Sequence, residues 1–328
     1  MLIKHMKQGC RQRFIPWAIG RLFASLLLSL VSVFASATAP SVYLLLSGEQ
    51  AYYQEVSTVF QRVLAERYHA LPVHTYTLDQ TLQVAPNSIV VAVGSRANEF
   101  ALSHLPDADI ISLLMPVSAW DDLLTRSSGA GRRAAVVIDQ PLERSVALGK
   151  LLVPTAKRVG AVFGPVSVAS KAELRGAVQR SGMELIYAEL ASDDNPIGVL
   201  APLVQKTDVF ITVADRAVFN KSVAKWLLYL SFRQKVSVIG FSKSYAKAGA
   251  LAAVYSSPEN IGRHGAELVS FLLSSQGKGQ GVDESWRTYY PEYYTLEVNR
   301  EVANALNIVV PELEELYREY QFLLESVQ

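Results

Sequence analysis

Small polar residues and glycines stand where several apolar runs of the sequence end. In open α/β sheets, ligands bind beyond the carboxyl ends of the strands. Hydroxyls, backbone N–H groups and helix N-termini at such an edge suit a small polar ligand, especially one with an anionic group such as a carboxylate. We therefore predict ligand contacts from these residues: Ser47, Gly48, Tyr52, Gly94, Ser95, Met115, Pro116, Gly164, Asp215, Phe241, Ser242 and Ser256.

Two interpretations stay open for several of these side chains, because turns and helix caps use the same residue types. Asp215 follows an apolar run and precedes a helical pattern, so its carboxylate could bind an amine or cap the helix. Asp139 poses the same choice, and there a cap is favoured. Tyr52 and Tyr53 suit stacking on a ligand, whereas the aromatic run at 289–294 favours packing over contact with a ligand.

Known catalytic patterns do not fit this chain. Outside the N-terminal segment, the histidines are His69, His74, His104 and His264, and no pair has the H-E-x-x-H spacing of a zinc site. A G-x-S-x-G elbow and a phosphate-binding P-loop are both missing. The glycines at 277, 279 and 281 follow a helical pattern inside a polar loop, so they indicate a linker. We predict a protein that is not an enzyme and that uses no metal or cofactor.

The elements that must position these residues alternate along the chain. Strands are expected at 41–46, 72–76, 89–93, 110–114, 134–138, 158–163, 184–188, 208–213, 236–240 and 249–255. Helices are expected at 49–68, 97–102, 170–180 and 217–232, with another beginning at Pro196. Continuous apolar strands between helices predict parallel sheets that are covered on both faces. The alternation runs twice, which predicts two Rossmann-like lobes joined by a hinge near residues 153–154.

Residues 1–37 have the order of a cleavable secretory signal. Basic residues and no acidic ones occupy 1–21, an uncharged apolar run follows at 22–34, and small residues come next. Cleavage after Ala37 is favoured over cleavage after Ala39, because Pro40 would directly follow the second site. The alternative is an uncleaved anchor, although the apolar run is short for a membrane span. The expected location is the periplasm.

Cysteine usage and charge narrow the class of protein further. The single cysteine, Cys10, precedes the apolar run, so it is not placed for lipidation, and the chain after cleavage would contain no cysteine. Removing the five basic residues of the signal would change 31 basic and 30 acidic residues to 26 against 30. A general nucleic-acid binder needs a basic face, so this balance disfavours that class. The mature protein is expected to be soluble.

Five segments stand in order along the chain: KRVGAVF at 157–163, the strand ending at Asp215, GALAA at 249–253, GRHGAEL at 262–268 and VNREVANALNIVVP at 298–311. Together they resemble the family of ABC-transporter substrate-binding proteins that includes tryptophan- and tyrosine-type binders. The resemblance covers nearly all of the chain after the signal and implies a type I periplasmic-binding-protein fold. It implies lobe one at 41–154 plus 257–287 and lobe two at 155–256 plus 288–328. Further crossings are expected at 254–258 and 286–295.

Two departures from the family pattern concern specificity. A Pro-Gly-Gly-Asn-x-Thr-Gly stretch is usual between the fourth and fifth strands, but residues 127–134 here are SSGAGRRA. An Asp-Pro step expected after the fourth strand is replaced by MPVS at 115–118. The resemblance places both segments on the ligand side of the fold. The resemblance therefore supports the fold more strongly than it supports specificity for amino acids.

The resemblance implies a periplasmic solute-binding protein. It would capture a small polar ligand in the cleft between the lobes and present it to an ABC permease. An amino-acid-like molecule is one candidate for this ligand. The alternative is an orphan binding protein that regulates a membrane sensor without delivering cargo. The sequence does not identify the ligand.

Overall fold

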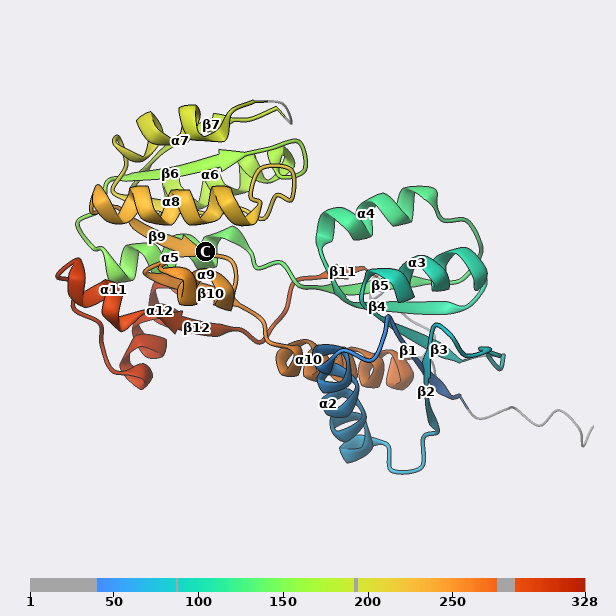
Figure 1. Cartoon of the computed structure of the whole chain (residues 1–328). Helices are drawn as coiled ribbons and strands as arrows, with labels where there is room; N and C mark the ends of the chain where they lie inside the picture. The colour runs from blue at the N-terminus through green and yellow to red at the C-terminus, as the bar shows by residue number, and fades with distance from the viewer. Residues whose placement is uncertain (1–39, 87, 192–193, 276–286, 328) are drawn as a thin grey trace, which may run out of the picture. The chain divides into compact units, whose positions relative to one another are not determined.

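The computed structural model describes residues 40–86, 88–191, 194–275 and 287–327, so the predicted signal at 1–37 and the linker glycines at 277–281 lie outside the described residues. Within 40–327 the chain forms two six-stranded sheets (Figure 1).

The first sheet is parallel throughout, with strand order β11-β5-β4-β3-β1-β2. Its strands are β1 (Val42–Leu46), β2 (Val73–Thr77), β3 (Ile89–Val93), β4 (Asp109–Met115), β5 (Arg133–Val137) and β11 (Thr288–Tyr289). The sequences of β1 and β3, VYLLL and IVVAV, are buried at every position. Helices cover both faces of this sheet, which is why its central strands are apolar runs instead of alternating patterns.

The second sheet repeats the same order, β12-β10-β9-β8-β6-β7. Its strands are β6 (Arg158–Phe163), β7 (Glu184–Glu189), β8 (Val209–Ile211), β9 (Ser237–Gly240), β10 (Ala252–Tyr255) and β12 (Thr295–Val298). All of its pairings are parallel except the one between β12 and β10. The two sheets confirm the predicted pair of Rossmann-like lobes, each with its own parallel sheet.

Helices pack on both faces of each sheet. The first sheet carries α2 (Ala51–Arg67) and α10 (Pro258–Ser275) on one face, and α3 (Ser95–His104) and α4 (Val117–Arg126) on the other. The second sheet carries α5 (Leu142–Leu152), α6 (Lys171–Arg180), α11 (Arg300–Ala305) and α12 (Leu313–Val327) on one face. Its other face is covered by α7 (Pro196–Val204), α8 (Lys221–Arg233) and α9 (Lys243–Ala248). The four apolar clusters between these layers are the core.

Helix α5, which ends before residue 154, packs on a different lobe from the one expected. The boundary predicted at 153–154 assigned α5 to lobe one, but Val146, Leu148 and Leu152 are buried in the core of the second sheet. The chain therefore leaves the first sheet between β5 and α5, near residues 138–141, and not at the hinge expected near residues 153–154. A sequence cannot reveal this, because an apolar helix face fits either sheet equally well.

Two further passages between the sheets follow from strand pairing and helix packing. β10 belongs to the second sheet, and α10 packs against α2 of the first. β11 then pairs with β5 in the first sheet, and β12 pairs with β10 in the second. The chain thus passes between the sheets near 256–257 and again within 290–294.

The helix expected at 217–232 begins later, at Lys221. Asn220 is its N-cap, and its side-chain oxygen accepts hydrogen bonds from Ser222 N (2.9 Å) and Val223 N (3.0 Å). The turn before it is held separately, because Asp215 accepts from Ala217 N and Val218 N. None of the helices in the described part of the chain combines the length and apolarity that a membrane crossing requires.

Candidate functional site

A cavity of about 310 Å³ lies where residues of both lobes meet. Its lobe-one lining lies at or just beyond the carboxyl ends of β4, β5 and β11: Leu114, Pro116, Val117, Ser118, Ile138, Asp139, Gln140 and Tyr290. Its lobe-two lining lies at or just beyond the carboxyl ends of β6, β8, β9 and β10 or comes from α5 and α6: Leu142, Ser145, Val166, Ser167, Ser170, Glu173, Thr212, Val213, Ala214, Phe241, Ser242, Tyr255 and Ser256. Parallel strands bring their carboxyl ends to one edge, so short strand-to-helix connections from both sheets converge here.

An irregularity in β4 shapes the lobe-one wall. The register of β4 against β5 shifts between Leu113 and Met115, and Leu114 has a φ of +57°. A left-handed conformation is unfavourable for leucine, and bulges of this kind redirect the residues around them. Leu114, Pro116, Val117 and Ser118 all line the cavity.

Two carboxylates hold the beginnings of the helices around the cavity. Asp139 Oδ2 accepts from Val117 N, the first residue of α4, at 2.7 Å. Glu173 Oε1 accepts from Leu142 N, the first residue of α5, also at 2.7 Å. The positive end of each helix dipole therefore faces a carboxylate supplied by the protein.

The cavity raises the pKa of its acidic groups. Burial raises the pKa of Asp139, and the charge of Asp121 adds to this, while the bond from Val117 opposes it. Burial likewise raises the pKa of Glu173, with contributions from Glu143 and Asp139, although its side chain remains open to solvent. The pKa of Tyr290 rises to about 12 through burial and the nearby carboxylates of Glu173 and Asp139. Burial is the largest cause of all three shifts, and the like charges of neighbouring carboxylates add to it.

The family model for ABC transporter substrate binding proteins matches residues 73–316, which is more than half of the 328-residue chain. The chain belongs to this ABC transporter substrate-binding protein family. No curated protein sequence matches it significantly.

Solved structures similar to this substrate-binding protein share its fold at low identity. One is an ABC domain from Streptococcus pneumonia in complex with L-Trp, at 16% identity and TM-score 0.54, covering 85% of this chain and 98% of its own. Another is the ligand-free, open structure of a substrate binding protein with adhesive properties from Clostridium difficile, at 17% identity and TM-score 0.62, covering 84% and 97%. A conserved domain protein from Vibrio cholerae has 18% identity and TM-score 0.53, covering 86% and 98%.

Four of the residues predicted to contact a ligand line the cavity of this substrate-binding protein: Pro116, Phe241, Ser242 and Ser256. The others lie outside its lining, and their role in ligand binding stays a prediction. Tyr52 is 45% exposed, and its ring lies 4.2 Å from the ring of Tyr53. Met115 is buried in the core between the first sheet and α3 and α4.

The predicted residues at the ends of β1 and β3 form a packed junction. Ser47 Oγ donates to Val93 O at 2.8 Å and accepts from Ala97 N at 2.9 Å, so its hydroxyl ties β3 to the first turn of α3. Gly94 has a φ of +86° and is the N-cap of α3, directly before Ser95. A Cβ at Gly94 would lie 2.5 Å from the Tyr53 ring, whereas a Cβ at Gly48 would meet only the side chain of Gln50.

Asp215 is used as a structural anchor. Its Oδ2 accepts from Val166 N, Ser167 N and Ser167 Oγ, and its Oδ1 accepts from Ala217 N and Val218 N. Burial acts to raise its pKa, but these hydrogen bonds outweigh burial and hold the pKa below its ordinary value. A Cβ at Gly164 would lie 2.7 Å from this carboxylate. These contacts hold the turns at 166–167 and 215–218, whereas the N-cap of α8 is Asn220 and not Asp215.

The aromatic run at 289–294 is mostly used for packing. Tyr289 lies against the core of the first sheet, and Tyr294 stacks on Tyr317 in lobe two. Tyr293 donates to both carboxylate oxygens of Glu267 at 2.9 Å. Tyr290 differs, because it lines the cavity.

Several residues of this cavity are not among the contacts predicted from the sequence. Asp139 lies two residues after β5 and Tyr255 is the last residue of β10, so their position at strand ends was a usable signal. Gln140, Ser145 and Glu173 lie beyond the strand ends or within helices, where their residue types carry no such signal. Only packing of α5 and α6 beside the connections brings Ser145 and Glu173 to the cavity.

The segment at 127–134 does not lie on the side of the cavity, contrary to the prediction. It connects α4 to the amino end of β5, where Gly131 N donates to Pro106 O and Ala130 N donates to Asp107. An α/β connection of this direction must return to the opposite edge of the sheet. The departure at 115–118 does lie at the cavity.

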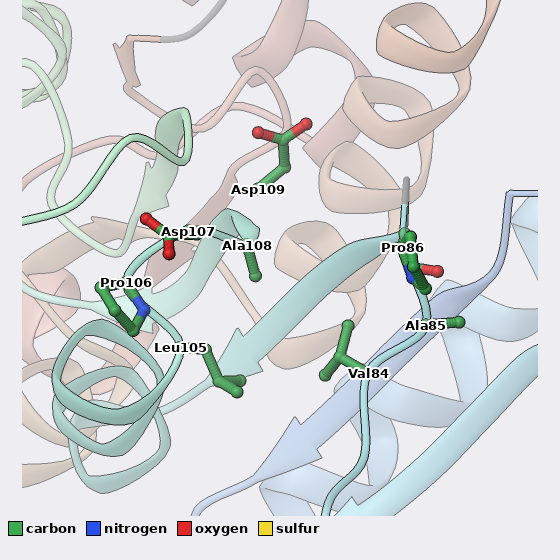
Figure 2. A pocket seen from close by; sticks show the side chains of 9 residues that line it. Val84, Ala85, Pro86, Leu105, Pro106, Asp107, Ala108 and Asp109 are labelled. Carbon is green, nitrogen blue, oxygen red and sulfur yellow. The ribbon is translucent and has the colours of Figure 1, made fainter.

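A second cavity of about 500 Å³ lies at that opposite edge, between the loops at 84–88 and 105–109. In Figure 2 the side chains of Val84 and Leu105 point toward one another, while the Asp107 carboxylate points away from them. Asp109 pairs with Arg132. Because this cavity lies at the amino ends of β3 and β4 and its carboxylates hold the 130–132 turn, it is not the candidate site.

Across 40–86, 88–191, 194–275 and 287–327, no three side chains of the His, Cys, Asp and Glu types are grouped as a metal site requires.

Proposed function

We propose that this protein is a periplasmic solute-binding protein that captures a small polar ligand in the interlobe cavity for an ABC importer. The observation that carries the proposal is the convergence of seven strand ends from two sheets on one cavity. Small-molecule sites are largely apolar pockets with a few convergent polar groups, usually of 300–1,000 Å³. Pro116, Phe241, Ser242 and Ser256 are proposed as contacts, now with Asp139, Gln140, Glu173 and Tyr290.

Export is part of this proposal and depends on the sequence of residues 1–37. Basic residues, an apolar run and an A-x-A site favour cleavage after Ala37 and release into the periplasm. Mass spectrometry of the protein recovered from the periplasm tests this, because cleavage after Ala37 leaves Thr38 as the first residue. An intact N-terminus in the membrane fraction would instead show an anchor.

Lobe closure around the ligand is also proposed. The lobes are joined by three segments, near 138–141, at 256–257 and within 290–294, and hinge closure around ligands uses a few such residues. We place lobe one at about 41–137 with α10 and β11, and lobe two from α5 to β10 with β12 to α12.

A thermal-shift screen tests ligand capture directly, because a ligand that binds only the folded state raises the melting temperature. The mature protein would be screened against amino acids, amines, sugars, nucleosides and organic acids. Each hit would be repeated with Ser242→Trp, which fills the cavity, and with Ser103→Trp on the exposed face of α3. Loss of the shift only in Ser242→Trp supports the cavity. A screen without any hit would contradict the proposal.

Delivery to an importer is a separate test. Uptake of an identified ligand would be measured in cells with and without the gene for this protein. Loss of uptake supports the importer role, whereas unchanged uptake with an altered response to the ligand would indicate a sensor partner.

A further inference from the structure

The charged side chains that line the cavity are all acidic. Among the residues that line it, Asp139 and Glu173 are acidic, and none is lysine, arginine or histidine. Asp139 lies in the crossing segment after β5, where it holds the start of α4 in lobe one, and Glu173 belongs to α6 in lobe two. Neither carboxylate takes part in an ion pair with another described residue. Two negative charges therefore face the cavity without a protein cation.

An anionic ligand group would find few partners here. The first N–H groups of α4 and α5 already donate to Asp139 and Glu173. The N–H groups of Val166 and Ser167 donate to Asp215. At the starts of α4 and α5 and in the turn at 166–167, the N–H groups that could hold a ligand carboxylate are thus occupied by carboxylates of the protein. Placing another anion beside them, away from water, is unfavourable because like charges repel and the charge loses hydration.

A cation would be favoured by the same groups. An ammonium or guanidinium can donate to the remaining lone pairs of Asp139 and Glu173, and charge-assisted hydrogen bonds are the strong ones. Tyr290 lies close enough to both carboxylates for their charges to raise its pKa, and tyrosine rings also attract cations. The rest of the wall is mostly apolar, including Val117 and Phe241, so it suits an apolar body behind the charged group.

We propose that the cavity selects an organic cation without a carboxylate, namely an amine or guanidine on a small apolar body. This inference rests on the proposed function and specifies its ligand class. It departs from the amino-acid-like ligand expected from the sequence, because a zwitterion would bring a carboxylate into a site that has no cation to receive it.

Matched ligand pairs test the proposal, since an amino acid and its decarboxylated amine differ only in the carboxylate. Isothermal titration calorimetry on the mature protein would compare phenethylamine with phenylalanine, cadaverine with lysine, and agmatine with arginine. At least one amine is expected to bind, and at least tenfold more tightly than its amino acid. An amino acid that binds as tightly as its amine, or more tightly, overturns the proposal.

Charge-neutral variants link the selectivity to the two carboxylates. Glu173→Gln and Asp139→Asn keep an oxygen that can accept from Leu142 N or Val117 N, so the helix starts stay capped. Each is expected to weaken amine binding at least tenfold, with circular dichroism confirming the native fold. Asp122→Asn, on the exposed face of α4 and outside the cavity lining, is the matched control and should bind as the unmodified protein does. Unchanged amine binding in Glu173→Gln and Asp139→Asn overturns the proposal.

Different outcomes would overturn the ligand class and the proposed function. If amino acids, sugars or organic acids bind in the cavity and amines do not, the ligand class is wrong and the proposed function stands. If no small molecule of any class binds, the proposed function fails, and this inference fails with it.

Discussion

Gln140 and Ser256 join two of the three segments that pass between the lobes, since Gln140 Nε2 donates to Ser256 Oγ at 2.8 Å. Ser256 Oγ in turn donates to Tyr293 O in the third segment. Arg144 completes the connection, because its Nη1 donates to Gln140 Oε1 at 2.6 Å and to Pro291 O at 2.7 Å. The three crossings are therefore tied by one hydrogen-bonded network beside the cavity.

Removing the guanidinium of Arg144 should destabilise this network. Arg144→Met keeps most of the apolar stem but leaves Gln140 Oε1 and Pro291 O without their donor, which is expected to lower the free energy of unfolding by about 2–3 kcal/mol. Urea denaturation followed by circular dichroism measures the change. Arg318→Met, on an exposed ion pair within α12, is the control and should change stability by less than about 0.5 kcal/mol. Equal effects of the two variants would argue against the network.

The Asp215 carboxylate should contribute more to the free energy of unfolding than a single helix cap does. Asp215→Asn replaces an oxygen that accepts several hydrogen bonds with an amide that can accept at only one end, so Val166 N and Ser167 N or Ala217 N and Val218 N lose their partner. The expected loss is about 2–4 kcal/mol of unfolding free energy, because the carboxylate is buried and its hydrogen bonds are charge-assisted. Asp122→Asn serves as the surface control. A loss below about 1 kcal/mol would show that water replaces the lost bonds.

The same residue predicts a pH dependence. The pKa of Asp215 is lower in the folded protein than in the unfolded chain, where it is about 3.9. Its stabilising contribution is therefore complete above the unfolded pKa and is lost as the pH falls from that value through the folded pKa. The difference in unfolding free energy between the unmodified protein and Asp215→Asn should shrink below about pH 4. A difference that stays constant from pH 6 to pH 2 would contradict the assigned cause.

Gly94 should tolerate no side chain. Its φ of +86° disfavours other residues, and a Cβ would lie 2.5 Å from the Tyr53 ring and 2.7 Å from Ser47 Oγ. Gly94→Ala is expected to cost about 2–4 kcal/mol, measured by urea denaturation. Gly198→Ala is the contrasting variant, because that glycine lies in α7 with open space around it and should gain up to about 1 kcal/mol. The prediction fails if both substitutions shift stability in the same direction.

The cap of α8 gives a smaller, local prediction. Asn220→Ala removes the oxygen that accepts from Ser222 N and Val223 N, and should cost about 1 kcal/mol. Gln50 is also an N-cap, of α2, but its side chain makes no capping bond, so Gln50→Ala should have little effect. Thermal unfolding of the two variants side by side makes the comparison. Equal shifts in melting temperature would show that the Asn220 side chain does not cap α8.

The sequence determined the buried strands because their signals are local. Apolar runs at 89–93 and 158–163 coincide with β3 and β6, and buried strands of this kind need only their own residues to be recognised. Their alternation with helices was enough for two parallel sheets. The C-terminal segment at 298–311 also indicated the substrate-binding-protein family that the family model then matched.

Only the tertiary structure decided which of these residues share a site. Strand ends looked equivalent in the sequence, yet Pro116 and Ser242 reach the cavity while Ser47 and Met115 are used within lobe one. Glu173 gave no signal at all, because its place depends on how α6 packs against α5. The lobe assignment of α5 has the same cause. Elements follow from local periodicity, whereas a site depends on long-range packing that brings distant residues into contact, and this chain's cavity charge exists only at that level.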